Sequence, residues 1–513
     1  MSDSGIDLRA SGGNGDGGVY RRFSCAVRAS RATERLRNYR IIANLTWCAW
    51  VALAIAAFSP VKLLPSAVMV SMLVVLSFGI LVYLAQRVAT TGDIKYLMAL
   101  ILISAQYAYF CLPFFDPAEI LTARFMGIFY NPSHTLHILE YSIVFILLFI
   151  FGFLASPIHG KSLLRDSEWH RLNNYVFTNR TVPILMIMGG SMLLLNFRLD
   201  EHIPPAFAFA GHLLAFAFPL CVIALAAGST SKLTWLFVFG VLYPVYYLIR
   251  IADGFVAEWV LVNLIMFIGY VLLGKRPPFA LAVVAAVLTV PLLRAKEVYR
   301  NDANVGYMTR FEAGKVFLVS GLDVPAVGLD SNETESRNSG DRLTTSREMA
   351  GPIVFSRVLD YHESGNVTYQ WGATFADLPL SVIPRAVAPW KPEKNFGQWF
   401  GHTYGIIKPG DQNTSVNLPP IVESYVNFGN FGVLLAVLLG GICAFLYDLF
   451  GGGKSTISVF LIIAIFAGLT NTELSISLGY GQVLQMSLVA WVLLILLRQY
   501  SGMRVRRVLA KET

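Results

Sequence analysis

The chain has 513 residues, of which 55% are hydrophobic and only 14% are charged. Soluble domains carry roughly a quarter charged residues, so this composition excludes an ordinary soluble protein and predicts a polytopic membrane protein. The formal net charge is +8, but much of the excess lies in the two tails and in short loops, where membrane topology accounts for it without a nucleic-acid partner.

Residues 1–40 are rich in Gly, Ser, Asp and Arg and lack apolar periodicity, which predicts a disordered basic cytoplasmic tail. Apolar runs of about 20 residues, the length that crosses a bilayer, then follow within 41–295. They predict nine transmembrane helices, at 41–58, 66–86, 96–115, 137–156, 181–199, 207–228, 233–252, 254–274 and 279–295. Three more runs within 431–498, at 431–450, 456–474 and 478–498, complete an all-α polytopic fold of about 12 transmembrane helices.

Lysines and arginines in short loops indicate which side of the membrane each loop faces. The N-terminal tail ends in ERLRNYR and the tail at 499–513 is also basic, so both termini are predicted to be cytoplasmic. Both termini on one side require an even number of spans. Because nine spans separate the cytoplasmic N-terminus from the long loop at 296–430, this loop is placed outside, in the periplasm of a bacterium. The predicted location is therefore the bacterial inner membrane.

The loop at 296–430 has two parts of different composition. The first includes GLDSNETESRNSGDRLTTSRE, which is typical of a flexible exposed segment. From Met349 to Gly429, aromatic residues, prolines and glycines alternate with a few charges, which predicts a compact cap over the membrane domain. A loop domain of this size usually carries a function.

Several catalytic patterns are missing from the sequence. The outer loop has no HExxH, CxxC or acidic DxD pattern, no GxSxG elbow occurs, and the five cysteines are scattered. GGGKST at 451–456 resembles the end of a P-loop, but Asp448 replaces the first glycine of that motif, so it is interpreted as a cytoplasmic turn. The missing patterns argue against a metal-dependent hydrolase and against a transferase that uses a soluble nucleotide sugar. No metal and no cofactor are therefore predicted.

The first cluster of candidate residues lies at the outer end of two predicted spans. Arg250, Asp253 and Glu258 occur within LIRIADGFVAEW, near the apolar boundary. Charged groups there are costly and are usually paired or functional. Arg250 could contact an anionic lipid headgroup; the alternative is an ion pair with Asp253 or Glu258 that stabilises the helical hairpin.

The second cluster is basic. Arg294 and Arg300 follow the ninth predicted span, and Arg357 lies in SRVLDYHE. Basic residues on the outer side oppose the usual charge bias, so topology does not explain them. Helical spacing predicts that Arg357, Asp360 and Tyr361 share one helix face, and the alternative to a functional role is a surface ion pair between Arg357 and Asp360.

The third cluster is IPRAVAPWKPEKNFGQWF at 383–400. Its prolines restrict the backbone, so Arg385 and Lys391 extend from a stiff strip. Arginine binds phosphate oxygens in a bidentate manner and lysine adds a mobile charge. The alternative is a rigid interfacial loop whose basic side chains reach the membrane surface.

This third cluster and its continuation resemble a known family. PRAVAPWKP, followed by TSxNLPPxxESYxNFGxxG at the start of a span, is similar to the repeat-unit polymerases of bacterial surface polysaccharides, which are Wzy-type enzymes related to the O-antigen ligases. The matching residues are Pro384, Arg385, Lys391, Pro392, Glu423, Tyr425, Asn427, Phe428, Gly429 and Gly432. At an earlier motif, where the family often carries Gly-Ser-Arg-Gly, this chain departs and reads IRIADG, with Arg250 in the corresponding place.

The resemblance implies a GT-C-like fold and a metal-independent, inverting glycosyltransferase at the periplasmic face of the membrane. The donor would be a glycan on undecaprenyl diphosphate and the acceptor the sugar end of another lipid-linked unit. Further partners would be membrane lipids and a chain-length regulator protein, and no nucleic acid. The alternatives are an O-antigen ligase-type transferase and a lipid-linked oligosaccharide flippase or transporter.

The same resemblance suggests roles for individual residues. Without a metal, cationic side chains must stabilise the leaving diphosphate; the candidates are Arg250, Arg294, Arg300, Arg357, Arg385 and Lys391. Glu423 is the first candidate for the general base, ahead of His362, Asp360 and Asp253, although it could instead orient Arg385. Tyr425 and Asn427 are expected to bind substrate.

Overall fold

The computed structural model describes residues 78–88, 94–115, 120–121, 124–155, 160–178, 241, 349–376, 378–381, 383, 396–411 and 414–512. The predicted spans at 41–58, 181–199, 207–228, 233–252, 254–274 and 279–295 lie outside these residues, apart from the isolated residue 241. So does the segment predicted to be flexible, GLDSNETESRNSGDRLTTSRE.

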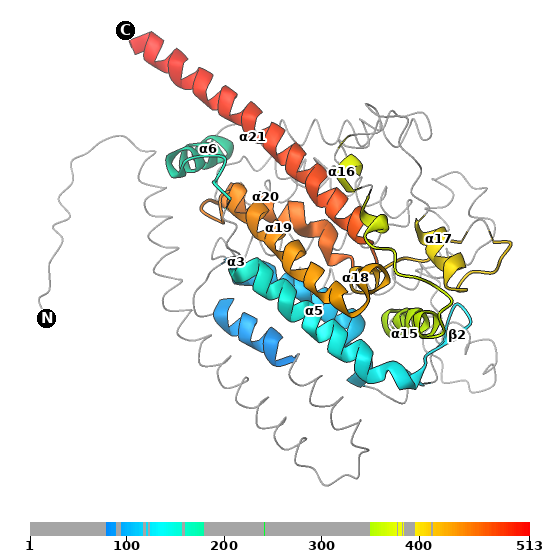
Figure 1. Cartoon of the computed structure of the whole chain (residues 1–513). Coiled ribbons are helices and arrows are strands. Elements are labelled where there is room, and N and C mark those ends of the chain that lie inside the picture. The colour runs from blue at the N-terminus through cyan, green and yellow to red at the C-terminus, as the bar shows by residue number, and fades with distance from the viewer. Residues whose placement is uncertain are drawn as a thin grey trace, which may run out of the picture.

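The described part of the chain is mostly helical (Figure 1). Its α-helices are α3 (Ile94–Phe110), α5 (Thr135–Ala155), α6 (Asp166–Thr178), α15 (Ala350–Glu363), α16 (Leu378–Ser381), α17 (Phe396–Thr403), α18 (Pro420–Phe428), α19 (Leu435–Leu449), α20 (Thr456–Phe466) and α21 (Ile476–Glu512). Short 3-10 helices are η1 (Leu112–Phe115), η2 (Pro132–His134), η5 (Ala373–Phe375), η6 (Gly429–Leu434) and η7 (Ala467–Thr470). Strands β1 (Arg124–Phe125) and β2 (Ile128–Phe129) form a two-stranded antiparallel sheet.

Among the described residues, three helical stretches are long and apolar enough to cross a membrane: Pro132–Ala155, Pro420–Leu449 and Ile476–Gln499. They correspond to the predicted spans at 137–156, 431–450 and 478–498. Apolar helices at Phe78–Val88, Ile94–Phe110 and Thr456–Thr470 are shorter and coincide with three further predicted spans.

One of these stretches begins earlier than the sequence predicted. Pro420 starts α18 within the segment that was assigned to the outer loop, and η6 connects α18 to α19. Proline suits the first turn of a helix because it lacks the N–H group that would be unpaired there. As a result Glu423, Tyr425 and Asn427 lie on a helix rather than on a loop.

Helices α5 and α19 pack directly against each other. A Cβ atom on Gly152 would overlap the backbone carbonyl of Val437, and one on Gly440 would overlap the backbone carbonyl of Phe149. Small residues of this kind let helix backbones approach closely in a membrane, where van der Waals packing replaces the hydrophobic effect as the main attraction.

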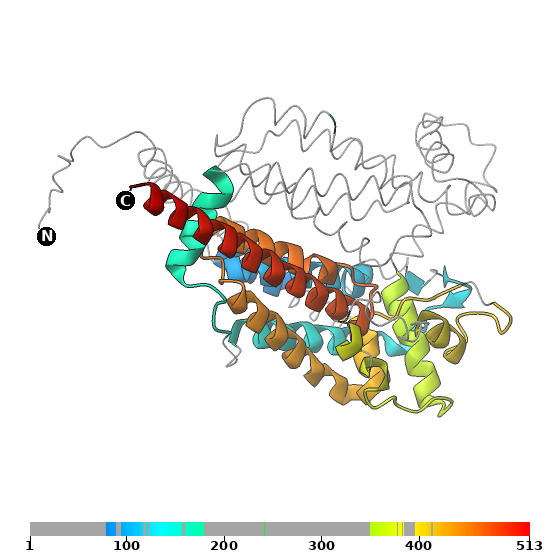
Figure 2. The same cartoon turned by 90° about the horizontal axis from the view of Figure 1, so that it is seen from above.

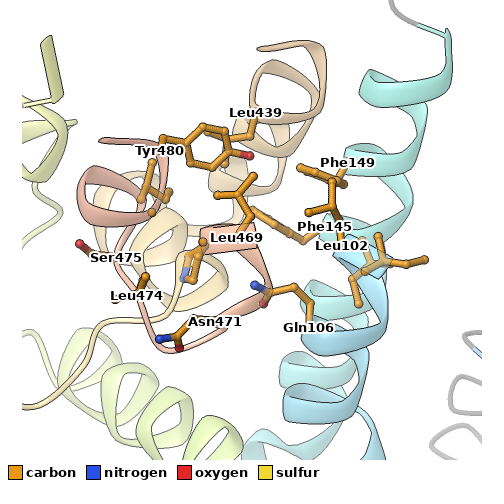
Figure 3. Close-up of a pocket in the computed structure, with 16 residues that line it drawn as sticks. Leu102, Gln106, Phe145, Phe149, Leu439, Leu469, Asn471, Leu474, Ser475 and Tyr480 are labelled. Atoms are coloured by element: carbon orange, nitrogen blue, oxygen red, sulfur yellow. The ribbon is translucent and has the colours of Figure 1, made fainter. Parts of the chain in front are cut away.

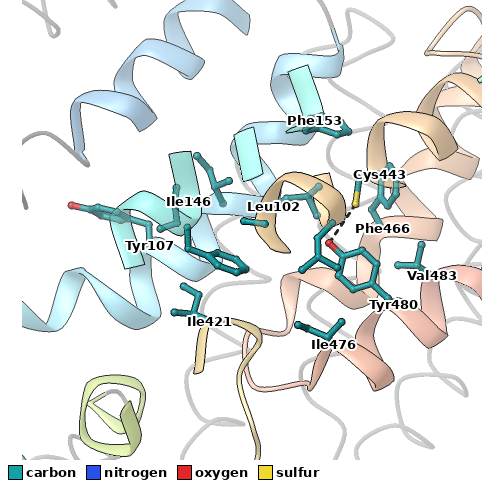
Figure 4. Close-up of a cluster of buried hydrophobic side chains, with 14 of the residues drawn as sticks. Leu102, Tyr107, Ile146, Phe153, Ile421, Cys443, Phe466, Ile476, Tyr480 and Val483 are labelled. Atoms are coloured by element: carbon teal, nitrogen blue, oxygen red, sulfur yellow. Dashed lines mark hydrogen bonds between the residues drawn. The ribbon is translucent and has the colours of Figure 1, made fainter. Parts of the chain in front are cut away.

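The buried core connects the early helices with the late ones (Figure 4). Leu102 on α3 and Phe153 on α5 belong to the same cluster as Ile421 on α18 and Val483 on α21. The ring of Phe153 makes an edge contact with Phe466 on α20 at 6.5 Å. These contacts make the described helices one packed bundle.

The two ends of this bundle differ in character. Helix α15 lies at the end opposite to α6 and to the C-terminus (Figure 2). We call it the α15 end; there α15 contacts α3, α5, α18 and the small sheet. The α6 end contains the GGGKST segment, which forms a turn between α19 and α20.

The turn at the α6 end is held by backbone hydrogen bonds and by the hydroxyl of Ser458. Gly451, Gly452 and Gly453 all have positive φ angles, and Ser458 accepts the N–H of Gly453 while it donates to the carbonyl of Phe450. A helix, not a strand, precedes this turn, in agreement with the interpretation that it is not a P-loop.

Candidate functional site

Four of the nine predicted site residues lie within the described structure: Arg357 on α15, and Glu423, Tyr425 and Asn427 on α18. The other five, Arg250, Arg294, Arg300, Arg385 and Lys391, lie outside the described residues. The described four occur at or near the α15 end, but they do not converge on a single point.

Helix α15 brings a row of polar side chains to this end. Its first two turns are buried, and its last two turns carry Arg357, Asp360, Tyr361 and His362. The helix stops after Glu363, where the N–H of Gly365 bonds the carbonyl of His362. Gly365 has a φ of 72°, the left-handed conformation that commonly ends helices.

The guanidinium of Arg357 is held by tyrosines. Its Nε donates to the carbonyl of Tyr404 at 3.1 Å, its Nη2 donates to the hydroxyl of Tyr361 at 3.2 Å, and the group lies 4.6 Å from the centre of the Tyr361 ring. Gly405 leaves room for it, since a Cβ there would overlap the Tyr361 hydroxyl. Among the described residues no carboxylate lies within ion-pair distance of Arg357. Arginine has five N–H donors, and these contacts use two of them.

Asp360 explains why the Arg357–Asp360 ion pair, considered as an alternative, does not form. Its Oδ1 accepts a hydrogen bond from Nδ2 of Asn131 at 2.7 Å and lies 2.9 Å from Nε2 of His134. The other ring nitrogen of His134 is 3.5 Å from Glu363. The carboxylates of α15 are therefore bound by Asn131 and His134, just before α5 begins, and Asp360 does not pair with the positive charge of Arg357.

Beside Arg357 lies a group of rings that we call the aromatic cluster, composed of His362, Tyr369, Tyr404 and Tyr425. His362 stacks on Tyr369 with a centroid separation of 4.6 Å, and its Nε2 is 3.0 Å from the hydroxyl of Tyr404. The ring of Tyr425 meets His362 edge-on at 5.7 Å. Burial lowers the pKa of His362 and raises the pKa of Tyr404, so a neutral imidazole and a protonated phenol are favoured at neutral pH.

Tyr425 was expected to bind substrate, and the structure places it inside this cluster. It is only 4% exposed, and the rings of Tyr141 and Phe355 make further edge contacts with it. In this conformation Tyr425 packs between the other rings of the aromatic cluster and the rings of the bundle core.

Asn427, the other predicted substrate-binding residue on α18, holds a neighbouring segment. Its Oδ1 accepts the N–H of Gly372 at 2.8 Å, its Nδ2 donates to Oγ1 of Thr374 at 2.8 Å, and its backbone carbonyl accepts the N–H of Trp371 at 3.1 Å. The side chain is completely buried. These bonds fix the conformation of the loop at 370–374.

Glu423 is 1% exposed, and its carboxylate accepts the N–H of Ile476, the first residue of α21. A carboxylate at this place is stabilised by the unpaired N–H groups and the positive end of the helix dipole. The geometry therefore gives Glu423 a capping interaction between α18 and α21. Its role as a general base stays a prediction.

An apolar pocket lies between α3, α5, α19 and the start of α21 (Figure 3). It has a volume of about 540 Å³ including its open mouth, and its walls include Leu102, Phe145 and Leu439. Gln106 also lines it, and the Oε1 atom of Gln106 is buried without a hydrogen-bond partner in the described structure. These walls suit an apolar group, and none of the described residues that line them carries a carboxylate, imidazole or amine for acid–base chemistry.

Comparisons of the chain with protein-family models, with curated proteins and with solved structures find no match. The function is therefore inferred from the residues and their geometry.

Sequence reasoning missed His134 and Tyr404, and it considered Trp371 only as one of several common residues that could form a sugar pocket. His134 follows an Asn-Pro pair at the start of a predicted span, and Trp371 precedes a glycine, which are weak signals of a helix start and a turn. Neither signal indicates the partner, because His134 and Asp360 are 226 positions apart.

Proposed function

We propose that this protein is a membrane glycosyltransferase that polymerises undecaprenyl-diphosphate-linked repeat units into a surface polysaccharide. The transfer is metal-independent and inverting, and it takes place at the periplasmic face of the bacterial inner membrane. The resemblance of 384–392 and 414–432 to repeat-unit polymerases supports this proposal, and the state of Arg357 is the structural observation that carries it.

Arg357 has the properties that a leaving diphosphate requires. The bond to the sugar breaks with negative charge developing on the diphosphate, and a preorganised guanidinium stabilises that charge without reorganisation. Ring stacking and the Tyr404 carbonyl fix the orientation of Arg357, and no described carboxylate neutralises it. Arginine is also well suited to bidentate contact with phosphate oxygens.

The proposal gives the remaining predicted residues supporting roles. Arg250, Arg294, Arg300, Arg385 and Lys391 are proposed to share the diphosphate charge with Arg357. A general base must take the proton of the attacking hydroxyl, and Glu423 and Asp360 are the described carboxylates proposed for it. Membrane lipids and a chain-length regulator are proposed partners.

The proposed topology has about 12 spans in a GT-C-like arrangement, with both termini in the cytoplasm and the loop at 296–430 in the periplasm. A cysteine introduced near Glu335 tests this arrangement in intact cells. Labelling by a membrane-impermeant reagent supports it, and labelling only after the inner membrane is broken contradicts it.

The function is tested by replacing Arg357 in cells that lack the native gene. With Arg357→Ala, we expect the long-chain ladder of surface polysaccharide to disappear from gels while single repeat units accumulate. Arg357→Lys should remain impaired, because an ammonium keeps the charge but cannot reproduce the planar fork. Arg171→Ala, which removes an exposed arginine on α6, is the matched control and should leave the ladder intact.

The same experiment distinguishes the alternatives. A ligase-type transferase would leave full-length chains on the lipid carrier, unattached to their final acceptor. In a separate assay with purified protein in liposomes, a flippase would move lipid-linked glycan across the liposome membrane without lengthening it. A normal ladder in the Arg357→Ala strain, with the variant present at wild-type level, would contradict the proposed role of this residue.

A further inference from the structure

Trp371 combines high exposure with an unfavourable backbone. Its side chain is 77% exposed and its φ angle is 48°. Bulky residues rarely adopt positive φ, and a residue held in that region costs about 1–3 kcal/mol, so it persists only where the surroundings determine it. A large apolar ring held outside the core by a strained backbone calls for an explanation by function.

The surroundings do determine it. The loop is bonded to the C-terminal end of α18 by the N–H groups of Gln370, Trp371 and Gly372, which donate to Val426 and Asn427. Ser477 on α21 donates to the carbonyl of Thr374 a few residues further on. The backbone that carries the indole is therefore fixed, and the rings of Trp371 and Phe428 meet in an edge-to-face arrangement with their centroids 6.4 Å apart.

From this indole, ring contacts and hydrogen bonds lead toward Arg357. Trp371 meets Tyr369 at 6.5 Å, Tyr369 stacks on His362, and His362 contacts the Tyr404 hydroxyl. The Tyr404 carbonyl in turn accepts a bond from Arg357. Trp371 is exposed, and Tyr369, His362 and Arg357 are half-buried, whereas Tyr404, which connects His362 with Arg357, is completely buried.

We propose that Trp371 is the stacking platform for a sugar ring of the lipid-linked glycan, with Tyr369 and His362, the half-buried polar members of the aromatic cluster, beside it. A sugar ring has an apolar C–H face that packs on an aromatic ring and hydroxyl groups that need donors and acceptors at its edge. This inference rests on the proposed function and extends it to a glycan subsite beside the diphosphate-binding Arg357.

The main alternative occupant of this indole is lipid, because tryptophan is common at membrane interfaces. An interfacial anchor needs no left-handed backbone, and it gains nothing from a neighbouring series of imidazole and phenol groups. The strain at Trp371 and the polar groups beside it both favour a specific ligand with hydroxyl groups.

Fluorescence of the purified full-length protein in nanodiscs tests the proposal directly. The spectrum of the wild type minus that of Trp371→Phe isolates the emission of this indole. The probe is the repeat-unit oligosaccharide of the host, released from its lipid diphosphate by mild acid. We expect the probe to change the difference spectrum in a saturable manner, while brominated lipids leave it unchanged.

Variants provide the second part of the test. Because these variants lack the indole, their affinity for the probe is measured by titration calorimetry: Trp371→Phe keeps an aromatic face and should retain binding, whereas Trp371→Leu should weaken it by roughly 5- to 10-fold, as expected for loss of an aromatic contact. Phe431→Leu is the matched control, since Phe431 is an exposed aromatic residue on η6, and its binding should match the wild type. Unchanged binding by Trp371→Leu, or quenching by brominated lipid without a response to saccharide, would overturn the proposal.

The result also separates this inference from the proposed function. Wild-type protein that binds the oligosaccharide through Trp371 but does not lengthen lipid-linked chains would sustain the subsite and refute the polymerase. Wild-type protein that lengthens chains, with an unchanged KM for lipid-linked units in Trp371→Leu, would sustain the polymerase and refute the subsite.

Discussion

Replacing Glu423 separates its capping interaction from a role in catalysis. Glu423→Gln removes the charge but keeps a side-chain carbonyl that can accept the N–H of Ile476. The lost interaction with the positive end of α21 is worth about 0.3–2 kcal/mol, so we expect the free energy of unfolding to fall by about 1 kcal/mol. Glu423→Ala also removes the acceptor.

The loss in Glu423→Ala should be larger for a definite reason. It leaves the N–H of Ile476 buried without its partner, which costs about 1–3 kcal/mol in addition to the dipole interaction, and the missing side chain leaves a void. We therefore expect a total of about 3–4 kcal/mol. Glu363→Gln is the control, because Glu363 is 60% exposed and should change stability by less than about 0.5 kcal/mol.

Denaturant titration of the purified variants in micelles, followed by far-UV circular dichroism, measures these differences. Chain lengthening is assayed on the same preparations. If Glu423 acts as a cap, Glu423→Gln keeps most of the activity and Glu423→Ala loses it together with stability. An inactive Glu423→Gln that is as stable as the wild type would refute this reasoning and establish the carboxylate as the general base.

Three further changes have expected outcomes that thermal unfolding of the purified protein can check. Gly451→Ala should lower the free energy of unfolding by about 2–3 kcal/mol, because Gly451 has a φ of 92° and a Cβ there would lie 2.7 Å from Trp169. Gly410→Ala is the control, because its Cβ meets open space and should change stability by less than about 0.5 kcal/mol. Burial lowers the pKa of His362, so the folded state binds fewer protons than the unfolded state, and the unfolding temperature should fall as the pH drops below about 6.5. His362→Gln should make the unfolding temperature depend less on pH, and an equal dependence in both proteins would contradict this expectation. Lys454→Ala breaks an exposed ion pair of 2.7 Å and should change stability by less than about 0.5 kcal/mol without any nucleotide effect; stabilisation of the wild type by ATP would contradict the interpretation of GGGKST as a turn.

Hydropathy correctly predicted the three long apolar helices of the described structure. It did not predict that the helical stretch before α19 begins at Pro420, because Pro420 to Phe428 is amphipathic and contains the polar residues Glu423, Ser424 and Asn427. Those residues are tolerated on a buried helix since each has a partner at the α15 end or on α21. Hydropathy alone does not reveal such partners.

The candidate site was only partly predictable for a related reason. Helical spacing correctly joined Arg357 with Tyr361, whose contact is local. Asp360 turned instead to His134 and Asn131, which a sequence places more than two hundred positions away. The positive φ of Trp371 is likewise a consequence of tertiary hydrogen bonds, and no local propensity of tryptophan favours it.

Because α5 and α19 are in close contact near one end of α5, a small tilt at this contact displaces the other end of the helix. Their backbones touch at Gly152, near one end of α5, while His134 holds α15 just beyond the other end, roughly 27 Å away at 1.5 Å per residue. A tilt of about 2° at the glycine contact would move the far end by about 1 Å, and a displacement of that size is enough to reduce a catalytic rate by about a hundredfold. Alanine at Gly152 would therefore displace Arg357, the proposed diphosphate contact, from the opposite end of the helix, without altering any side chain of the proposed site.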